Sequence, residues 1–432
     1  MSSLEPLAMR SGVNLSAFDS GMATQSYLVA YENRHWCVSE VVYLILLQLP
    51  LQTSHEGIQD ELMQSHHVRP TEQQINSVIE FVTRNGLAEG YLAADPAPAR
   101  NRYLWLRITI VPASLVARVR LFTVFFSKRL FIPGSVVGVL WLAYMLLTRP
   151  AAAMAEQLQT LPLVQFVQCF LVVLLIGLIH EFGHSSALLR FGQQPGRIGV
   201  GVYFIMPVFF SDVTRAWRLK RMQRIMVDAG GMYLQVIGMM AIAFVNAMFF
   251  KSGAVDLAVV LAAAEIVANL NPFIKLDGYW LLTDGLGVTN LRRAMADMLL
   301  APFRKHRSRT TANGGLSAGR SAILVIYFLA QCGFLVYFGS MILHSIRVSF
   351  TAFWGDAAML VAGKVSLADL SLHSIGTYVS SRLVSLVVIL FVVRMVMSLV
   401  KWAAKSVPKA VKALSSRRGE GNSADSHVPS PA

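Results

Sequence analysis

The sequence has few charged residues and few cysteines. Only 14% of its 432 residues are charged, whereas soluble domains carry about 25%, so the composition excludes an ordinary soluble globular enzyme. Because 55% of the residues are hydrophobic, a disordered or fibrous chain is excluded as well. Three cysteines are too few for a disulfide framework. The hydrophobic residues are concentrated in long runs, which predict a polytopic membrane protein.

Six apolar runs meet or approach the length of about 20 residues that crosses a bilayer. They are Leu130–Leu147, Leu163–Leu188, Met226–Phe250, Val255–Leu270, Ser321–Ile346 and Tyr378–Val400. Seven basic residues lie in 189–225, eight in 271–320 and six in 401–418, against four in the three alternate loops. By the positive-inside rule the basic segments are cytoplasmic, and so are both termini. We therefore expect a multi-pass protein of the cell membrane, surrounded by lipid, whose positive charge needs no nucleic-acid partner.

Residues 1–100 differ from the rest, because they carry eleven acidic and five basic side chains. Thr71 is placed to cap a helix, and the apolar residues after it share one helical face. They are Ile75, Val78, Ile79 and Val82. Together with an extended element at Tyr27–Tyr31, this pattern predicts a small, soluble, winged-helix-like α/β domain. We expect a membrane domain at 101–403 and a disordered polar and basic tail at 404–432. The fold class is thus mainly α: a polytopic membrane helix bundle with this small domain.

The second apolar run contains His180, Glu181 and His184 within the sequence HEFGH. Positions i and i+4 share one face of a helix, so both imidazoles are able to bind one metal ion. Glu181 lies beside them, where it can act as general base toward a water at the metal. Zinc suits two neutral imidazoles plus a carboxylate, with a fourth position for water. A chance match is the alternative, but such residues are costly at membrane depth and indicate function.

A catalytic zinc site needs a third protein ligand, and two acids are candidates. Asp277 follows the helix-breaking Asn271-Pro272, and we expect Asp277-Gly278 to form a turn that directs the carboxylate inward. Glu265 lies inside the fourth run, more than one turn deeper than Asn271. The depth of Asp277 matches that of His184 better. We therefore predict one zinc ion per chain, with Asp277 as the third ligand and Glu265 as the alternative.

The segment Ile198–Phe210 is apolar but too short to span a bilayer. It contains Gly199, Gly201 and Pro207, which disfavour a helix, so we expect a short membrane-associated β-hairpin. Extended backbone at membrane depth is tolerated only where it is buried in protein or lines a cavity. A strand edge there would pair with an unfolded substrate segment. A purely structural hairpin is the alternative.

HEFGH inside an apolar run, followed about ninety residues later by NPFIKLDGY, resembles the site-2 protease family of intramembrane zinc metalloproteases (peptidase M50). The resemblance covers roughly residues 115–400. It implies a core of transmembrane helices with zinc near the cytoplasmic face. It also implies His180, His184 and Asp277 as zinc ligands, Glu181 as catalytic base and Asn271 as a residue that helps to bind substrate. Many members carry a Gly-Pro pair after the metal-binding helix, where this chain has Ala229-Gly230-Gly231-Met232-Tyr233.

Two further segments carry resemblances. The sequence PVFFSDVTRAWRL at 207–219 is similar to a subgroup of peptide zinc metalloproteases. Residues 1–100 are similar in pattern to the PqqD-type peptide-binding winged helix of peptide-maturation systems. These resemblances imply a ribosomally made peptide as substrate and peptide-export components as partners.

The expected function is an intramembrane zinc metalloendopeptidase that hydrolyses a membrane protein segment or a ribosomally made peptide. One alternative is a membrane transporter, which would spread polar residues along several spans. Another is an inactive export-complex scaffold, whose structural zinc would have its fourth position closed by protein. Here the polar residues cluster at one depth on two spans, which favours the enzyme.

Overall fold

The computed structural model describes most of the first 361 residues. The described residues are 7–20, 25–32, 34–52, 54–91, 104–118, 120–149, 157, 161–203, 206–288, 290–291, 294–295, 318–361 and 397. Two units are distinguished by their internal contacts, Met1–Gln331 and Cys332–Ala432, and each is described by itself. The sixth predicted run, apart from Met397, and the predicted disordered tail at 404–432 lie outside the described residues.

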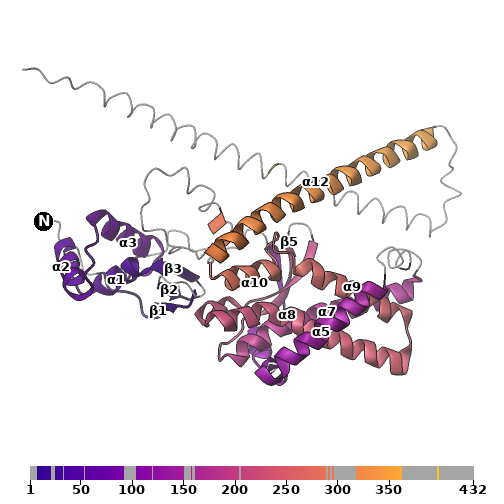
Figure 1. Cartoon of the computed structure of the whole chain (residues 1–432), viewed down its shortest axis with the longest axis horizontal. Helices are drawn as coiled ribbons and strands as arrows, with labels where there is room; N and C mark the ends of the chain where they lie inside the picture. Colours follow the sequence, from indigo (N-terminus) through magenta and orange to yellow (C-terminus); the bar gives the residue numbers. More distant parts are fainter. Residues whose placement is uncertain are drawn as a thin grey trace, which may run out of the picture. The chain divides into compact units, whose positions relative to one another are not determined.

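Residues 7–91, here called the N-terminal module, form three strands followed by three helices (Figure 1). These elements are β1 (Asn14–Phe18), β2 (Ser26–Tyr31), β3 (Arg34–Ser39), α1 (Glu40–Gln48), α2 (His55–His66) and α3 (Glu72–Arg84). The strands form an antiparallel sheet in the order β1-β2-β3, and β2 contains the extended element expected at Tyr27–Tyr31. The module is therefore an α/β unit as predicted, while its likeness to a winged helix stays a prediction.

The start of α3 follows the sequence prediction. Thr71 Oγ1 accepts a hydrogen bond from the backbone N–H of Gln74, and the Gln74 side chain accepts one from the backbone N–H of Thr71. This reciprocal capping box satisfies two N–H groups that the helix leaves unpaired. Ile75, Val78 and Val82 are buried in the core of the module, with Ile79 partly buried.

Within the described residues, four helices are long and apolar enough to cross a membrane, by length and composition, which indicates a membrane protein. They are α5 (Lys128–Thr148), α7 (Leu163–Arg190), α8 (Arg221–Val245, continued by the π-helical turn η3, Asn246–Phe250) and the Gly319–Tyr337 part of α12 (Ala318–Val361). The fourth predicted run lies in α9 (Gly253–Asn269), whose 17 residues rise only about 25 Å. The described part of the chain therefore does not confirm six spans.

Helices α7 and α8 lie against each other (Figure 1), and glycines lie at their contact. A Cβ added at Gly183 of α7 would overlap the carbonyl oxygen of Gly230 in α8. Small residues at such contacts allow helix backbones to approach each other, which is the usual basis of packing in membranes. Helix α9 packs against this pair with a buried row that includes Ala262 and Ala263. The close approach brings α8 alongside the HEFGH sequence of α7.

The predicted hairpin is present, with one additional strand. Strands β5 (Ile198–Tyr203) and β6 (Met206–Ser211) pair antiparallel, and β4 (Leu104–Val111) pairs with β5 in the order β4-β5-β6. The sequence analysis did not foresee β4. Phe209 of β6 packs against Gly177 of α7. The hairpin therefore lies beside α7, about one helical turn before His180.

Short helical elements complete the description. They are α4 (Ala113–Val116), η1 (Leu121–Phe126), η2 (Thr214–Arg218) and α10 (Asp277–Leu286).

We predict that Gly183→Ala lowers the thermal unfolding temperature of the detergent-solubilised chain. The added methyl group meets the α8 backbone, and overpacking of this kind costs about 1–3 kcal/mol. Gly319→Ala is the matched control, because a Cβ there meets nothing within 4 Å. Equal unfolding temperatures for the two variants would contradict the close contact between α7 and α8.

Candidate metal centre

Three side chains from two separate helices converge at one point. His180 and His184 come from α7, and Asp277 is the first residue of α10. His180 Nε2 lies 2.9 Å from Asp277 Oδ2, His184 Nε2 lies 3.5 Å from Asp277 Oδ1, and the two Nε2 atoms are 3.1 Å apart. One ligand atom from each residue lies within 4.8 Å of the others. This group can hold a metal ion.

Hydrogen bonds at the far side of each imidazole fix its orientation. His180 Nδ1 lies 2.7 Å from Gln235 Oε1, and His184 Nδ1 lies 2.7 Å from the carbonyl oxygen of Val227. The carbonyl oxygen can only accept, and Gln235 uses its Nε2 to donate to Ala262 O at 3.4 Å. Each Nδ1 therefore carries the proton, and each Nε2 presents its lone pair to the shared point. Metal-binding histidines are usually held in this way.

Gly231 of α8 leaves the space that a metal ion would need. A Cβ added at this position would collide with Nε2 of both His180 and His184. Any other residue here would therefore fill the region toward which the two lone pairs point. The donor set of two neutral imidazoles and one carboxylate fits zinc with one position left for water.

The polar side chains of the site are mostly buried. His180, Glu181 and His184 are 7%, 8% and 6% exposed, and the Asp277 side chain is 22% exposed. A carboxylate binds a metal ion in its ionised form and an imidazole in its neutral form.

The prediction that Asp277-Gly278 forms a turn was wrong. The turn lies before this pair, at residues 272–275, and Asp277 is the first residue of α10. Leu276 is extended, and its carbonyl oxygen accepts from the backbone N–H of Tyr279, so the chain enters a helix directly. Gly278 packs against the carbonyl of Leu270, where a Cβ would overlap. This contact holds the start of α10 against the end of α9.

Glu265 and Asn271, the other two predicted site residues, precede Asp277 in the sequence and do not belong to the group of potential ligands. Glu265 is exposed on α9 and is not among the three potential ligands. The structure therefore brings Asp277, and not Glu265, to the histidines. Asn271 Oδ1 accepts from the backbone N–H of Phe273 at 2.9 Å and so supports the turn after α9. A role of Asn271 in substrate binding stays a prediction.

The sequence analysis missed the α8 residues that complete the site. Gln235 is fully buried and orients His180, while Gly231 provides space. One signal was available, because Gln235 is an uncharged polar residue within an apolar run, and such residues usually face the interior of a helix bundle. Val227 acts through its backbone, so its side chain carried no signal.

Comparison with known proteins gives one distant similarity. Over 116 residues the chain is 26% identical to the "Putative peptide zinc metalloprotease protein YydH" of Bacillus subtilis (strain 168). The matched segment covers 27% of this chain and 46% of that protein, so the chain spans about half the length of the relative it matches. No family model matches the chain, and no solved structure matches it. That protein is named as a metalloprotease, and the His180, His184 and Asp277 group of this chain could hold a metal ion.

Proposed function

We propose that this protein is an intramembrane zinc metalloendopeptidase of the site-2 protease type (M50). The convergence of His180, His184 and Asp277 beside the buried Glu181 carries the proposal. The two histidines lie on a helix that is long and apolar enough to cross a membrane. The similarity to a protein named as a peptide zinc metalloprotease supports the same reaction.

Each side chain has a defined task in peptide hydrolysis. His180, His184 and Asp277 hold the zinc ion. When bound, zinc supplies Lewis acidity, which makes a water more acidic and polarises the scissile carbonyl. The Glu181 carboxylate accepts the proton of the attacking water and returns it to the leaving amine. Gln235 and the Val227 carbonyl keep both Nδ1 atoms protonated, so neither imidazole competes with Glu181 for that proton.

The substrate is an extended segment of a membrane protein or of a ribosomally made peptide. A helical peptide bond is shielded, so the segment must unwind before a water can reach it. Strand β6 supports this step, because it is an edge of the described β4-β5-β6 sheet and packs against Gly177 through Phe209. An unpaired strand edge binds an extended peptide by backbone hydrogen bonds. Asn271, in the turn after α9, helps to position the substrate.

The proposal includes a location in the cell membrane with both termini in the cytoplasm. The charge distribution of the sequence supports this orientation. In this arrangement the N-terminal module lies in the cytoplasm, where it can meet a newly made peptide. The proposed partners are peptide-export components in the same membrane. A transporter or a structural zinc site is less well supported, because His180, His184 and Asp277 are three potential ligands, and three protein ligands plus a water are typical of a catalytic zinc site.

We predict that Glu181→Gln abolishes cleavage but leaves the zinc content unchanged. The amide cannot accept the proton from water, and general bases contribute about 10²–10⁴-fold to such reactions. Mass spectrometry of peptides from membranes that contain either the parent chain or the variant measures the loss of products. Metal analysis of the purified proteins is the control.

Full activity of Glu181→Gln would refute the mechanism. Metal uptake into liposomes by both proteins would favour a transporter instead.

We predict that Asp277→Ala lowers the zinc content of the purified protein, whereas Glu265→Ala does not. Among the described residues, which include Glu265, Asp277 is the acid grouped with the two histidines as a potential ligand. Elemental analysis after dialysis against a weak chelator measures the difference. The reverse result would make Glu265 the third ligand.

We predict that Gly231→Ala also lowers the zinc content, although Gly231 is not a ligand. The methyl group would occupy the space next to both Nε2 atoms. Gly333→Ala serves as the control, since a Cβ at Gly333 meets nothing within 4 Å. Normal zinc content in Gly231→Ala would show that the ion lies elsewhere.

A further inference from the structure

Arg224 is a buried cation near the start of α8, outside the ligand group, and is only 3% exposed. Its Nε donates to Asp284 Oδ1 at 2.8 Å, its Nη1 to Leu219 O at 3.0 Å and its Nη2 to Asp19 O at 3.0 Å. Its Cζ lies 4.4 Å from the centre of the Phe18 ring. A buried charge is costly unless it is paired and hydrogen-bonded. The guanidinium therefore holds these groups around it.

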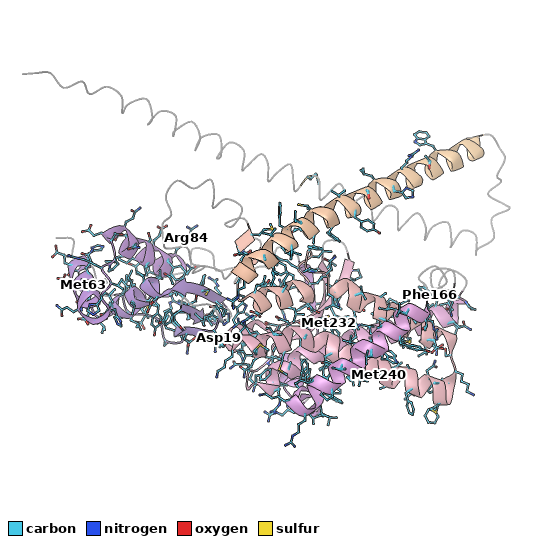
Figure 2. All side chains as sticks on the ribbon, viewed as in Figure 1. Asp19, Met63, Arg84, Phe166, Met232 and Met240 are labelled. Carbon is cyan, nitrogen blue, oxygen red and sulfur yellow. The ribbon has the colours of Figure 1, made fainter. Side chains whose placement is uncertain are left out.

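Two of these partners, Phe18 and Asp19, belong to the N-terminal module, and Figure 2 labels Asp19. Asp19 Oδ2 also accepts from the backbone N–H of Arg221 at 3.1 Å. The carbonyl oxygen of Ser20 occupies the space where a Cβ of Gly287 would lie. Gly287 ends α10 with a φ of 72°. The end of β1 therefore contacts both the start of α8 and the end of α10.

Helices α8 and α10 are joined at two levels. At one level Gly231 of α8 borders the histidines that Asp277 of α10 contacts. At the other level Arg224 of α8 binds Asp284 of α10. Seven residues separate the two levels on each helix, so both segments rise about 10 Å and the helices run antiparallel. The Arg224–Asp284 pair therefore fixes the axial position of α10, and with it that of Asp277.

Helix α10 needs this support, because it has only ten residues. A helix of that length is marginal unless other parts of the protein hold it. Metal–ligand distances must be correct to within about 0.2 Å. A small axial shift of α10 would thus change the contact between Asp277 and the ion.

We propose that Phe18 and Asp19 are positioning residues for the metal centre, and that they act on Asp277 through Arg224 and Asp284. The inference rests on the proposed zinc site and adds a task for the N-terminal module. Contact of the module with Arg224 completes the support of α10. The zinc affinity of the site therefore depends on the contact of Phe18 and Asp19 with Arg224.

The zinc dissociation constant of the full-length, detergent-solubilised protein tests this, measured by competition with a chelator. We expect Asp284→Asn to raise it by roughly 10–100-fold, as is usual for residues that orient metal ligands. Phe18→Leu should raise it by a smaller factor. Both substitutions keep the approximate side-chain size, which limits damage to the fold. The absorption spectrum of the Co²⁺-substituted protein should change in both variants, because it reports the geometry of the ligands.

Arg69→Ala is the matched control within the N-terminal module. Its ion pair with Asp60, at 3.8 Å, is 65% exposed on both side chains, and exposed pairs contribute little to stability. We expect unchanged zinc affinity and an unchanged cobalt spectrum in this variant.

The double variant Phe18→Leu/Asp284→Asn tests whether Phe18 acts on the metal centre through Asp284. If Phe18 acts through Asp284, the double variant should bind zinc no more weakly than Asp284→Asn alone. Independent, multiplying effects would overturn the route, and parent-like zinc affinity and cobalt spectra in both single variants would overturn the inference itself. Failure of the parent chain to bind zinc would overturn the proposed function as well, so the two failures are distinguishable.

Discussion

The orientation of two imidazoles within apolar helices is the interaction on which the rest of the site depends. An imidazole binds a metal only through a nitrogen that lacks a proton, and both rings are buried, so neighbouring protein groups determine which nitrogen carries the proton. The side-chain oxygen of Gln235 and the carbonyl oxygen of Val227 accept from Nδ1 of the two rings, which leaves each Nε2 without a proton. Both belong to α8, so the chemistry of α7 is set by its neighbour. The distance between the two helices is therefore a chemical constraint as well as a packing constraint.

Glycine satisfies both constraints at once. At Gly183 and Gly230 the backbones of α7 and α8 come into contact, which brings Val227 and Gln235 within hydrogen-bond reach of the rings. One residue further along, Gly231 keeps α8 away from the Nε2 atoms. The pair Gly230-Gly231 thus allows close approach on one side and provides space on the other. A larger residue at either position would change the distance or fill the centre.

The sequence predicted the parts of the site that follow from local spacing. The i and i+4 positions of His180 and His184 and the cap at Thr71 are properties of a single helix, and both are present in the structure. Asp277 was chosen over Glu265 by its expected depth, yet the turn assigned to it was misplaced, because the sequence does not reveal that Leu276 leads directly into a helix. Gln235, Arg224 and strand β4 act through partners far away in the chain, and the one local signal among them was the polar Gln235 within an apolar run.

The basic residues at the start of α8 have two tasks that the sequence alone does not separate. Arg221 and Arg224 contribute to the positive charge that predicts orientation in the membrane. In the structure Arg221 also donates to the carbonyl oxygens of Asp284 and Gly285 at the end of α10. A cation at this position is favoured by the helix dipole. Removing these charges to test membrane topology would therefore also disturb α10 and the Asp277 carboxylate at its other end. Topology is better tested at a basic residue outside this contact, such as Arg190.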